Sequence, residues 1–90
     1  PAIFNLGRCY FYGIATTVDK QTAFEMFFKA ANLDYPEANF MLGYMYSYGD
    51  GIAKDMVKAK EYLKKAANSG LKEASEELEK IYQKTKGDEW

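Results

Sequence analysis

Apolar side chains recur along the chain at the spacing of one helical face. Ala2, Leu6 and Tyr10 follow one another at intervals of four residues near the N-terminus. Because an α-helix turns once every 3.6 residues, side chains at i, i+4 and i+8 share a face, so this run predicts an amphipathic helix. Similar stripes lie further along, at Ala23, Phe27, Ala30 and Ala31, at Ala38, Leu42 and Tyr46, and at Ala59, Leu63, Ala66 and Ala67.

Turn and capping residues mark where these helices begin and end. Gly13 and the stretch 48–51 interrupt the pattern, and glycine readily adopts the left-handed conformation of a tight turn. Asp19 and Asp55 fit helix N-caps, Pro36 fits a first helical position, and Gly70 fits the position after a helix end. We therefore expect about five helices, at about 1–12, 19–32, 36–48, 55–68 and 72–85, and an all-α fold.

The chain repeats itself with a period of 36 residues. When positions 1–36 are compared with 37–72 without a gap, 14 of 36 residues are identical. A third, partial copy begins at Glu73 and keeps Leu78 and Tyr82 in register. A fixed period of this length is the signature of a helical repeat array, in which each unit buries its apolar face on its neighbours.

Small residues in register explain how the predicted helices pack. Gly7 and Gly43 lie in mid-helix, where glycine costs about 0.5–1 kcal/mol relative to alanine. Together with the alanine doublets at 30–31 and 66–67, these glycines would let helix backbones approach closely. We expect antiparallel helix pairs that stack side by side.

The charge and composition of the chain argue against some classes of function. The net charge is −1 with no run of Lys or Arg, so nothing indicates nucleic-acid binding. No apolar run approaches the roughly 20 residues of a membrane span, and no signal peptide is visible, so membrane insertion is not expected. Cys9 is the only cysteine and cannot form an internal disulfide, which slightly favours the cytoplasm or another reducing compartment.

The residues that carry most catalysis are missing. Histidine, the commonest general base and a common metal ligand, is absent. Asp50 and Asp55 flank a glycine turn but lack the closing Glu of a calcium loop, so a turn former and an N-cap account for them. No nucleophile–base pair appears. We expect no enzyme, no cofactor and no metal.

These residues resemble the Sel-one-like repeat, a relative of the tetratricopeptide repeat. Its pattern of Ala, Leu-Gly, Tyr, Gly-x-Gly, Asp, Lys-Ala and Ala-Ala-x-x-Gly is met in the second copy by Ala38, Leu42-Gly43, Tyr46, Gly49-Asp50-Gly51, Asp55, Lys58-Ala59 and 66–70. The first copy departs at Ala15 and Asp34, where glycines are usual, so its first interhelix loop, Ile14 to Val18, is expected to differ in shape. The resemblance implies a right-handed α/α superhelix, or solenoid, that acts as a protein–protein interaction scaffold or adaptor.

The register divides the chain into a first repeat at 1–35, a second at 36–71 and a partial third at 72–90. The third places Glu79 where the others have glycine and is highly charged, so it is expected to act as a C-terminal cap. The N-terminus lacks such a cap, and Ile3, Phe4 and Leu6 are placed to meet an earlier unit. We expect a fragment of a longer array, or self-association through this end.

In solenoids of this kind, the first helix of each unit lines the concave face, where a partner peptide or helix would bind. Exposed Tyr and Arg side chains on a rigid groove are typical interface anchors. Residues next to the Leu-Gly core are expected there: Arg8, Phe11, Tyr12, Tyr44, Ser47, Tyr48, Glu76 and Lys80.

Core packing is the alternative role for the aromatic residues. We expect Phe4 and Phe40 in the core, and Tyr10, Tyr46 and Tyr82, which recur in register, in structural positions. Cys9 aligns with Met45 and Ile81 and is expected to be buried. Tyr12 and Tyr48 also recur, so packing remains an alternative for them. Arg8, Phe11 and Tyr44 vary between copies and are the better interface candidates.

Two other functions compete with the scaffold. The chain could be a structural spacer or self-association segment, whose aromatic residues only seal neighbouring repeats. It could also be a hydrolase, by analogy with the cysteine-rich secreted branch of the family. The lone Cys9 argues against that branch, whose repeats each carry a disulfide.

Overall fold

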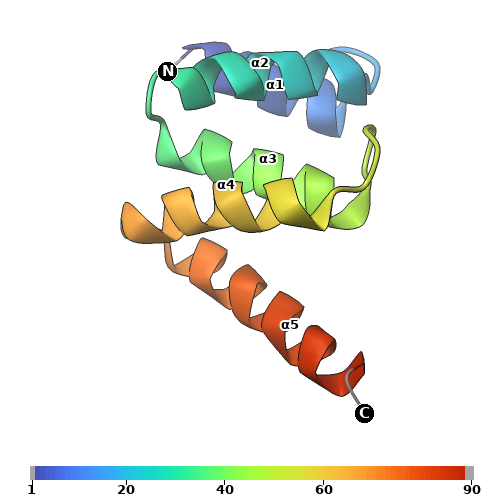
Figure 1. The fold of residues 1–90 in the computed structure, drawn as a ribbon. Coiled ribbons are helices and arrows are strands. Elements are labelled where there is room, and N and C mark those ends of the chain that lie inside the picture. The colour runs from blue at the N-terminus through green and yellow to red at the C-terminus, as the bar shows by residue number, and fades with distance from the viewer. Residues whose placement is uncertain (1, 89–90) are drawn as a thin grey trace.

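Five α-helices form an elongated stack of about 45 × 25 × 17 Å (Figure 1). The computed structural model describes residues 2–88, and side chains over residues 2–83. The helices are α1 (Ala2–Tyr12), α2 (Lys20–Asn32), α3 (Pro36–Tyr48), α4 (Met56–Asn68) and α5 (Lys72–Asp88). Over residues 2–88 no strand occurs, which confirms the all-α prediction. Pro1, the first residue of the predicted first repeat, and residues 89–90 of the predicted cap lie outside the described range.

The predicted capping residues begin and end the helices. The Asp19 carboxylate accepts hydrogen bonds from the backbone N–H of Thr22 at 3.1 Å and from its hydroxyl at 2.7 Å. Asp55 accepts from the N–H groups of Val57 and Lys58 at 3.1 and 3.2 Å. These bonds satisfy N–H groups that have no partner inside the helix. Pro36 is the first residue of α3, as predicted. The helix α5 extends to Asp88, three residues beyond the predicted end.

Each repeat is an antiparallel helix pair, and each pair packs on the next through its second helix. Helix α1 packs on α2, α2 on α3, α3 on α4, and α4 on α5. The first helices of the units are therefore α1, α3 and α5, and the second helices are α2 and α4. In Figure 1, α5 lies at the end of the stack farthest from the N-terminus.

The buried side chains form two clusters that follow the chain direction. The first contains Phe4, Phe11, Ala23, Phe27, Ala30, Ala38, Met41, Leu42 and Met45, and the second contains Leu63, Ala66, Ala74 and Ile81. Phe40 is half-buried and packs against both clusters. Phe4 is 8% exposed and contacts Phe27 and Tyr35, so the core role expected for it is confirmed.

The mid-helix glycines lie where two backbones come close. A Cβ atom added to Gly43 would stand 2.6 Å from Leu63 Cγ and 3.1 Å from the backbone oxygen of Ala59. A Cβ on Gly7 would stand 2.8 Å from the Phe27 ring. Any larger residue would therefore push the second helix away from the first. The expected close approach within each helix pair is confirmed.

The loop of the first repeat has the shape of its counterpart, contrary to expectation. Ala15 adopts a φ of 60° where Gly51 has 82°, and Asp34 adopts 61° where Gly70 has 97°. The backbone hydrogen bonds also match, because Asp19 N donates to Tyr10 O at 2.9 Å and Asp55 N to Tyr46 O at 3.0 Å. Ala15 thus adopts a left-handed conformation, which costs a non-glycine residue about 1–2 kcal/mol, in a loop that backbone hydrogen bonds tie to α1.

Two side chains are more exposed than their repeat positions suggested. Cys9 is half-buried, whereas its counterparts Met45 and Ile81 are buried. Tyr82 is 42% exposed, whereas Tyr10 and Tyr46 are half-buried. Cys9 lies on α1 and Tyr82 on α5, the first and last of the described helices.

Replacing Gly43 with alanine tests the close approach. Alanine is the better helix former, yet its methyl group would collide with Leu63, and we expect a net loss of about 1–3 kcal/mol in the free energy of unfolding. Urea denaturation followed by circular dichroism measures it. The matched control is Glu79→Ala, at the exposed equivalent position of α5, where stability should hold or rise slightly. Equal stability of Gly43→Ala and the native protein would contradict the packing argument.

Candidate functional site

The predicted partner-binding residues lie on the first helices of the units. We call the exposed sides of α1, α3 and α5 the first-helix face. Tyr12 and Tyr48 are 57% and 55% exposed, and Tyr44 is half-buried. Arg8, Glu76 and Lys80 are exposed, whereas Ser47 is half-buried.

Four rings form a continuous aromatic ridge across α1 and α3. The ring centroids are 4.8 Å apart for Tyr12 and Phe11, 6.4 Å for Phe11 and Tyr44, and 4.7 Å for Tyr44 and Tyr48. The first two pairs meet edge to face, a favoured aromatic geometry worth about 0.5–1.5 kcal/mol beyond area burial. The ridge therefore presents Tyr12 and Tyr48 to solvent on a base of packed rings.

Phe11 is the buried base of this ridge, so the expectation that it is an exposed anchor is wrong. Its ring is 6% exposed and lies 6.1 Å from Phe27 in the first core cluster. The ammonium of Lys20 lies 3.4 Å from the ring centroid and covers the remaining face. A cation over a phenyl face is stabilising, since the ring carries negative charge there.

Phe11 differs between the two repeats because two residues that pack against each other, Phe11 and Lys20, are replaced together. Where the first repeat has Phe11 and Lys20, the second has Ser47 and Met56. Lys20 also forms an ion pair with Asp50 at 3.1 Å, which ties the start of α2 to the loop after α3. The difference at position 11 alone does not reveal the contact between Phe11 and Lys20. The joint difference at positions 11 and 20 is the signal in the sequence that points to it.

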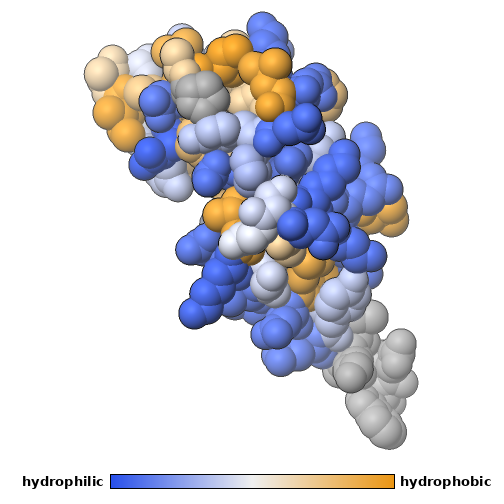
Figure 2. Space-filling model, turned by 90° about the vertical axis from the view of Figure 1, so that its left-hand side faces the viewer, coloured by the Kyte–Doolittle hydropathy of each residue, from blue (hydrophilic) through white to orange (hydrophobic). Residues whose placement is uncertain are grey.

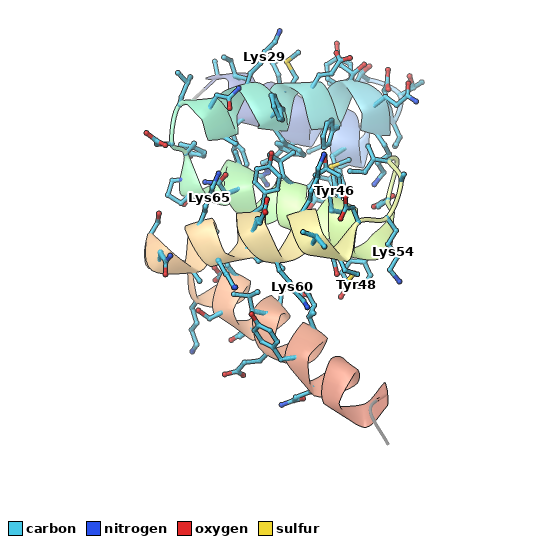
Figure 3. The ribbon with its side chains drawn as sticks, in the orientation of Figure 1. Lys29, Tyr46, Tyr48, Lys54, Lys60 and Lys65 are labelled. Atoms are coloured by element: carbon cyan, nitrogen blue, oxygen red, sulfur yellow. The ribbon has the colours of Figure 1, made fainter. Side chains whose placement is uncertain are left out.

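The ridge ends at a polar contact with α5. The Tyr48 hydroxyl donates to Glu77 at 3.1 Å, and Lys80 forms an ion pair with the same carboxylate at 3.3 Å. Desolvation of the phenol, followed by the negative charge of Glu77, raises the pKa of Tyr48, so its hydroxyl remains a donor. Figure 3 shows Tyr48 at the end of α3. Glu77 was missing from the predicted set, and no pattern in the sequence singled it out.

Among the described residues, no group of three or more His, Cys, Asp or Glu side chains could hold a metal ion. Hydrogen bonds from Thr22 lower the pKa of Asp19, as its capping role requires. Nowhere within residues 2–88 is a helix both long and apolar enough to cross a bilayer.

The helix pairs and their glycines agree with a match to a known repeat family. The family model described as the Sel1 repeat matches residues 1–35 and again residues 36–71. The chain belongs to the Sel1 repeat family. These matches coincide with the two complete helix pairs and confirm the resemblance. Proteins of this family are in general protein–protein interaction modules and non-catalytic scaffolds.

Solved Sel1-type structures share the fold. A Sel1 repeat protein from Oxalobacter formigenes is 38% identical, with a TM-score of 0.84 over 88% of this chain and 59% of that one. A protective antigen of uropathogenic Escherichia coli with an SLR fold is 37% identical, with a TM-score of 0.88 over 93% of this chain and 18% of that one. Helicobacter pylori cysteine rich protein B is 27% identical, with a TM-score of 0.76 over 81% and 55%.

The coverage of these structures limits what they imply. This Sel1 chain spans less than two thirds of the length of each of the three. A comparison with curated proteins gives no significant match. The solenoid fold is therefore established, and the role of the particular surfaces has to be argued from the residues.

The burial of Phe11 predicts a loss of stability on truncation. Phe11→Ala removes a core ring and leaves the Lys20 ammonium without its aromatic partner, so we expect a loss of about 3–5 kcal/mol in the free energy of unfolding. Chemical denaturation measures it, with Tyr12→Ala as the exposed control, which should change stability by less than about 1 kcal/mol. A Phe11→Ala protein of native stability would show that the ring is peripheral.

Proposed function

We propose that the first-helix face binds a peptide or helix of a partner protein and that the chain acts as an adaptor. The carrying observation is the pair of tyrosines at equivalent positions, Tyr12 and Tyr48, each more than half exposed on a base of packed rings. Tyrosine buries a large area on binding and loses little rotamer freedom, which makes it a strong anchor. We infer that these first helices line the concave side of the stack.

Polar groups around the ridge would orient the partner. Arg8 is exposed one turn before Tyr12, and Glu76 and Lys80 are exposed on α5. These three side chains, one carboxylate and two cations, suit a partner that carries both acidic and basic residues. Charges at the rim of an interface act more on orientation and association rate than on affinity. Ser47 and Tyr44, on α3, are half-buried. Binding, and not catalysis, is what this combination of groups supports.

Peptides selected against the protein test the ridge. Binders from a random peptide display library should lose at least about tenfold in affinity for the double variant Tyr12→Ala, Tyr48→Ala, measured by fluorescence anisotropy. Val57→Ala, at a residue 69% exposed on α4, is the control and should bind normally. If the selected peptides bind the double variant as tightly as the native protein, the ridge is not the binding face.

We further propose that the open side of α1 associates with another copy of the chain. Leu6 is 50% exposed, whereas its counterpart Leu42 is fully buried beneath α2. Ala2 is likewise exposed where Ala38 is buried. On the side shown in Figure 2, apolar residues gather over the α1–α2 end, and the α4–α5 end is mainly hydrophilic. The side of α1 that carries Ala2 and Leu6 is therefore exposed, whereas the equivalent side of α3 is buried.

Sedimentation equilibrium measures this association. The native protein should form dimers at concentrations on the order of 100 μM, since the apolar area available is small. Leu6→Glu should shift it to monomer, because a buried carboxylate would lie in the contact. Val57→Glu should leave the equilibrium unchanged. A native protein that stays monomeric at millimolar concentration would exclude self-association through α1.

A further inference from the structure

A second line of rings lies on the opposite side of the stack, between the second helices α2 and α4. The ring centroids are 6.2 Å apart for Phe28 and Phe24, 5.6 Å for Phe24 and Tyr46, and 5.9 Å for Tyr46 and Tyr62. Phe24 and Phe28 come from α2, Tyr46 from α3 and Tyr62 from α4. We call these four residues the outer seam. Figure 3 shows Tyr46 in the space between the α2 and α4 ribbons.

The outer seam has an open apolar end and a cationic edge. Phe28 is 41% exposed, and a surface hollow of about 250 Å³ is lined by Phe24, Glu25, Phe28 and Lys29. On α4, the ammonium of Lys58 lies 5.6 Å from the Tyr46 ring centroid, and that of Lys65 lies 5.4 Å from the Tyr62 ring centroid. Neither of these lysines belongs to the ion pairs found among the described side chains. The helix α4 carries four lysines and one glutamate.

The second repeat carries charged residues at the positions of the two phenylalanines, although Phe24 also packs against the first core cluster. The positions of Phe24 and Phe28 are occupied there by Lys60 and Lys64. Lys60 places its ammonium 5.5 Å from the ring centroid of Tyr82, so a lysine covers this tyrosine as Phe24 covers Tyr46. A helix of the same repeat type therefore forms with charged residues at both positions. The exposed ring of Phe28 serves neither the repeat pattern nor the core.

We propose that the outer seam is a second docking site, which binds an acidic amphipathic helix of a partner protein. The seam runs between two helices, and an amphipathic helix laid there would place apolar side chains against Phe28 and Phe24. Its carboxylates would meet Lys58 and Lys65, which have no acidic partner among the described residues. The ammonium groups of Lys58 and Lys65, which lie beside the tyrosines of the seam, favour an acidic occupant over a basic one. This site lies apart from the first-helix face, and the proposal does not rest on the function proposed for that face.

A pair of designed peptides tests the proposal. The probe is a 16-residue helical peptide with leucines at one face and glutamates elsewhere, and the comparison peptide has lysines in place of the glutamates. Isothermal titration calorimetry should give micromolar to submillimolar binding of the acidic peptide, at least tenfold tighter than of the basic one. Binding of the acidic peptide should also weaken as salt is raised, because the lysines contribute through charge.

Variants of the protein locate the site. Phe28→Lys introduces the residue that the second repeat already carries at this position, so the fold should be kept and affinity for the acidic peptide should fall at least about tenfold. Tyr48→Ala, on the first-helix face, should bind this peptide normally. Loss of binding by Tyr48→Ala together with normal binding by Phe28→Lys would overturn the proposal, as would absence of binding at 1 mM peptide.

An anionic membrane is the competing occupant of a surface that combines phenylalanines and lysines. Co-sedimentation with vesicles of phosphatidylglycerol and phosphatidylcholine distinguishes the two. No sedimentation of the native protein supports a protein helix as the occupant. Sedimentation that is lost in Phe28→Lys would assign the seam to lipid and overturn the proposal.

Discussion

The contact on which the rest of the structure depends is the close approach of the two helices within each repeat, at Gly43 beside Leu63 and at Gly7 beside Phe27. A missing side chain on the first helix lets a large apolar one on the second fill the space. This contact fixes the distance within the pair and leaves the outer sides of both helices free. Because the same contact recurs one period later, both complete repeats form the same kind of helix pair, and equivalent positions lie on equivalent helices.

The stack has two faces with different aromatic arrangements. On the first helices, tyrosines at equivalent positions stand on packed rings, and the arrangement ends at the Tyr48–Glu77 hydrogen bond. Between the second helices, phenylalanines of the first repeat meet tyrosines of the second. The positions of Phe24 and Phe28 carry Lys60 and Lys64 in the second repeat, so a helix of this repeat type also forms with charged residues there.

Much of the architecture could be predicted from the sequence because it depends on local chemistry. Asp19, Asp55 and Pro36 mark helix starts through backbone geometry, and the register of glycines gives the pairing. The predictions were wrong where tertiary packing, and not the difference between the two repeats at a single position, decides the environment of a residue. Phe11 seemed variable and therefore exposed, but Lys20 closes over it from another helix. Ala15 predicts a different loop, but the loop keeps the backbone hydrogen bonds of its counterpart and Ala15 adopts the left-handed conformation. Glu77 belongs to no motif and is found only by its distance from Tyr48.

Helix α3 contributes to both faces, since Tyr44 and Tyr48 lie on one and Tyr46 on the other. Two occupants, one on each side, would therefore be in contact with a single rigid rod. A rotation of that helix about its axis would move Tyr46 and Tyr48 in opposite directions. Two occupants that favoured different rotational settings would then weaken each other's binding, and by thermodynamic linkage the effect would be equal in both directions. Both proposed surfaces thus depend on the placement of one helix.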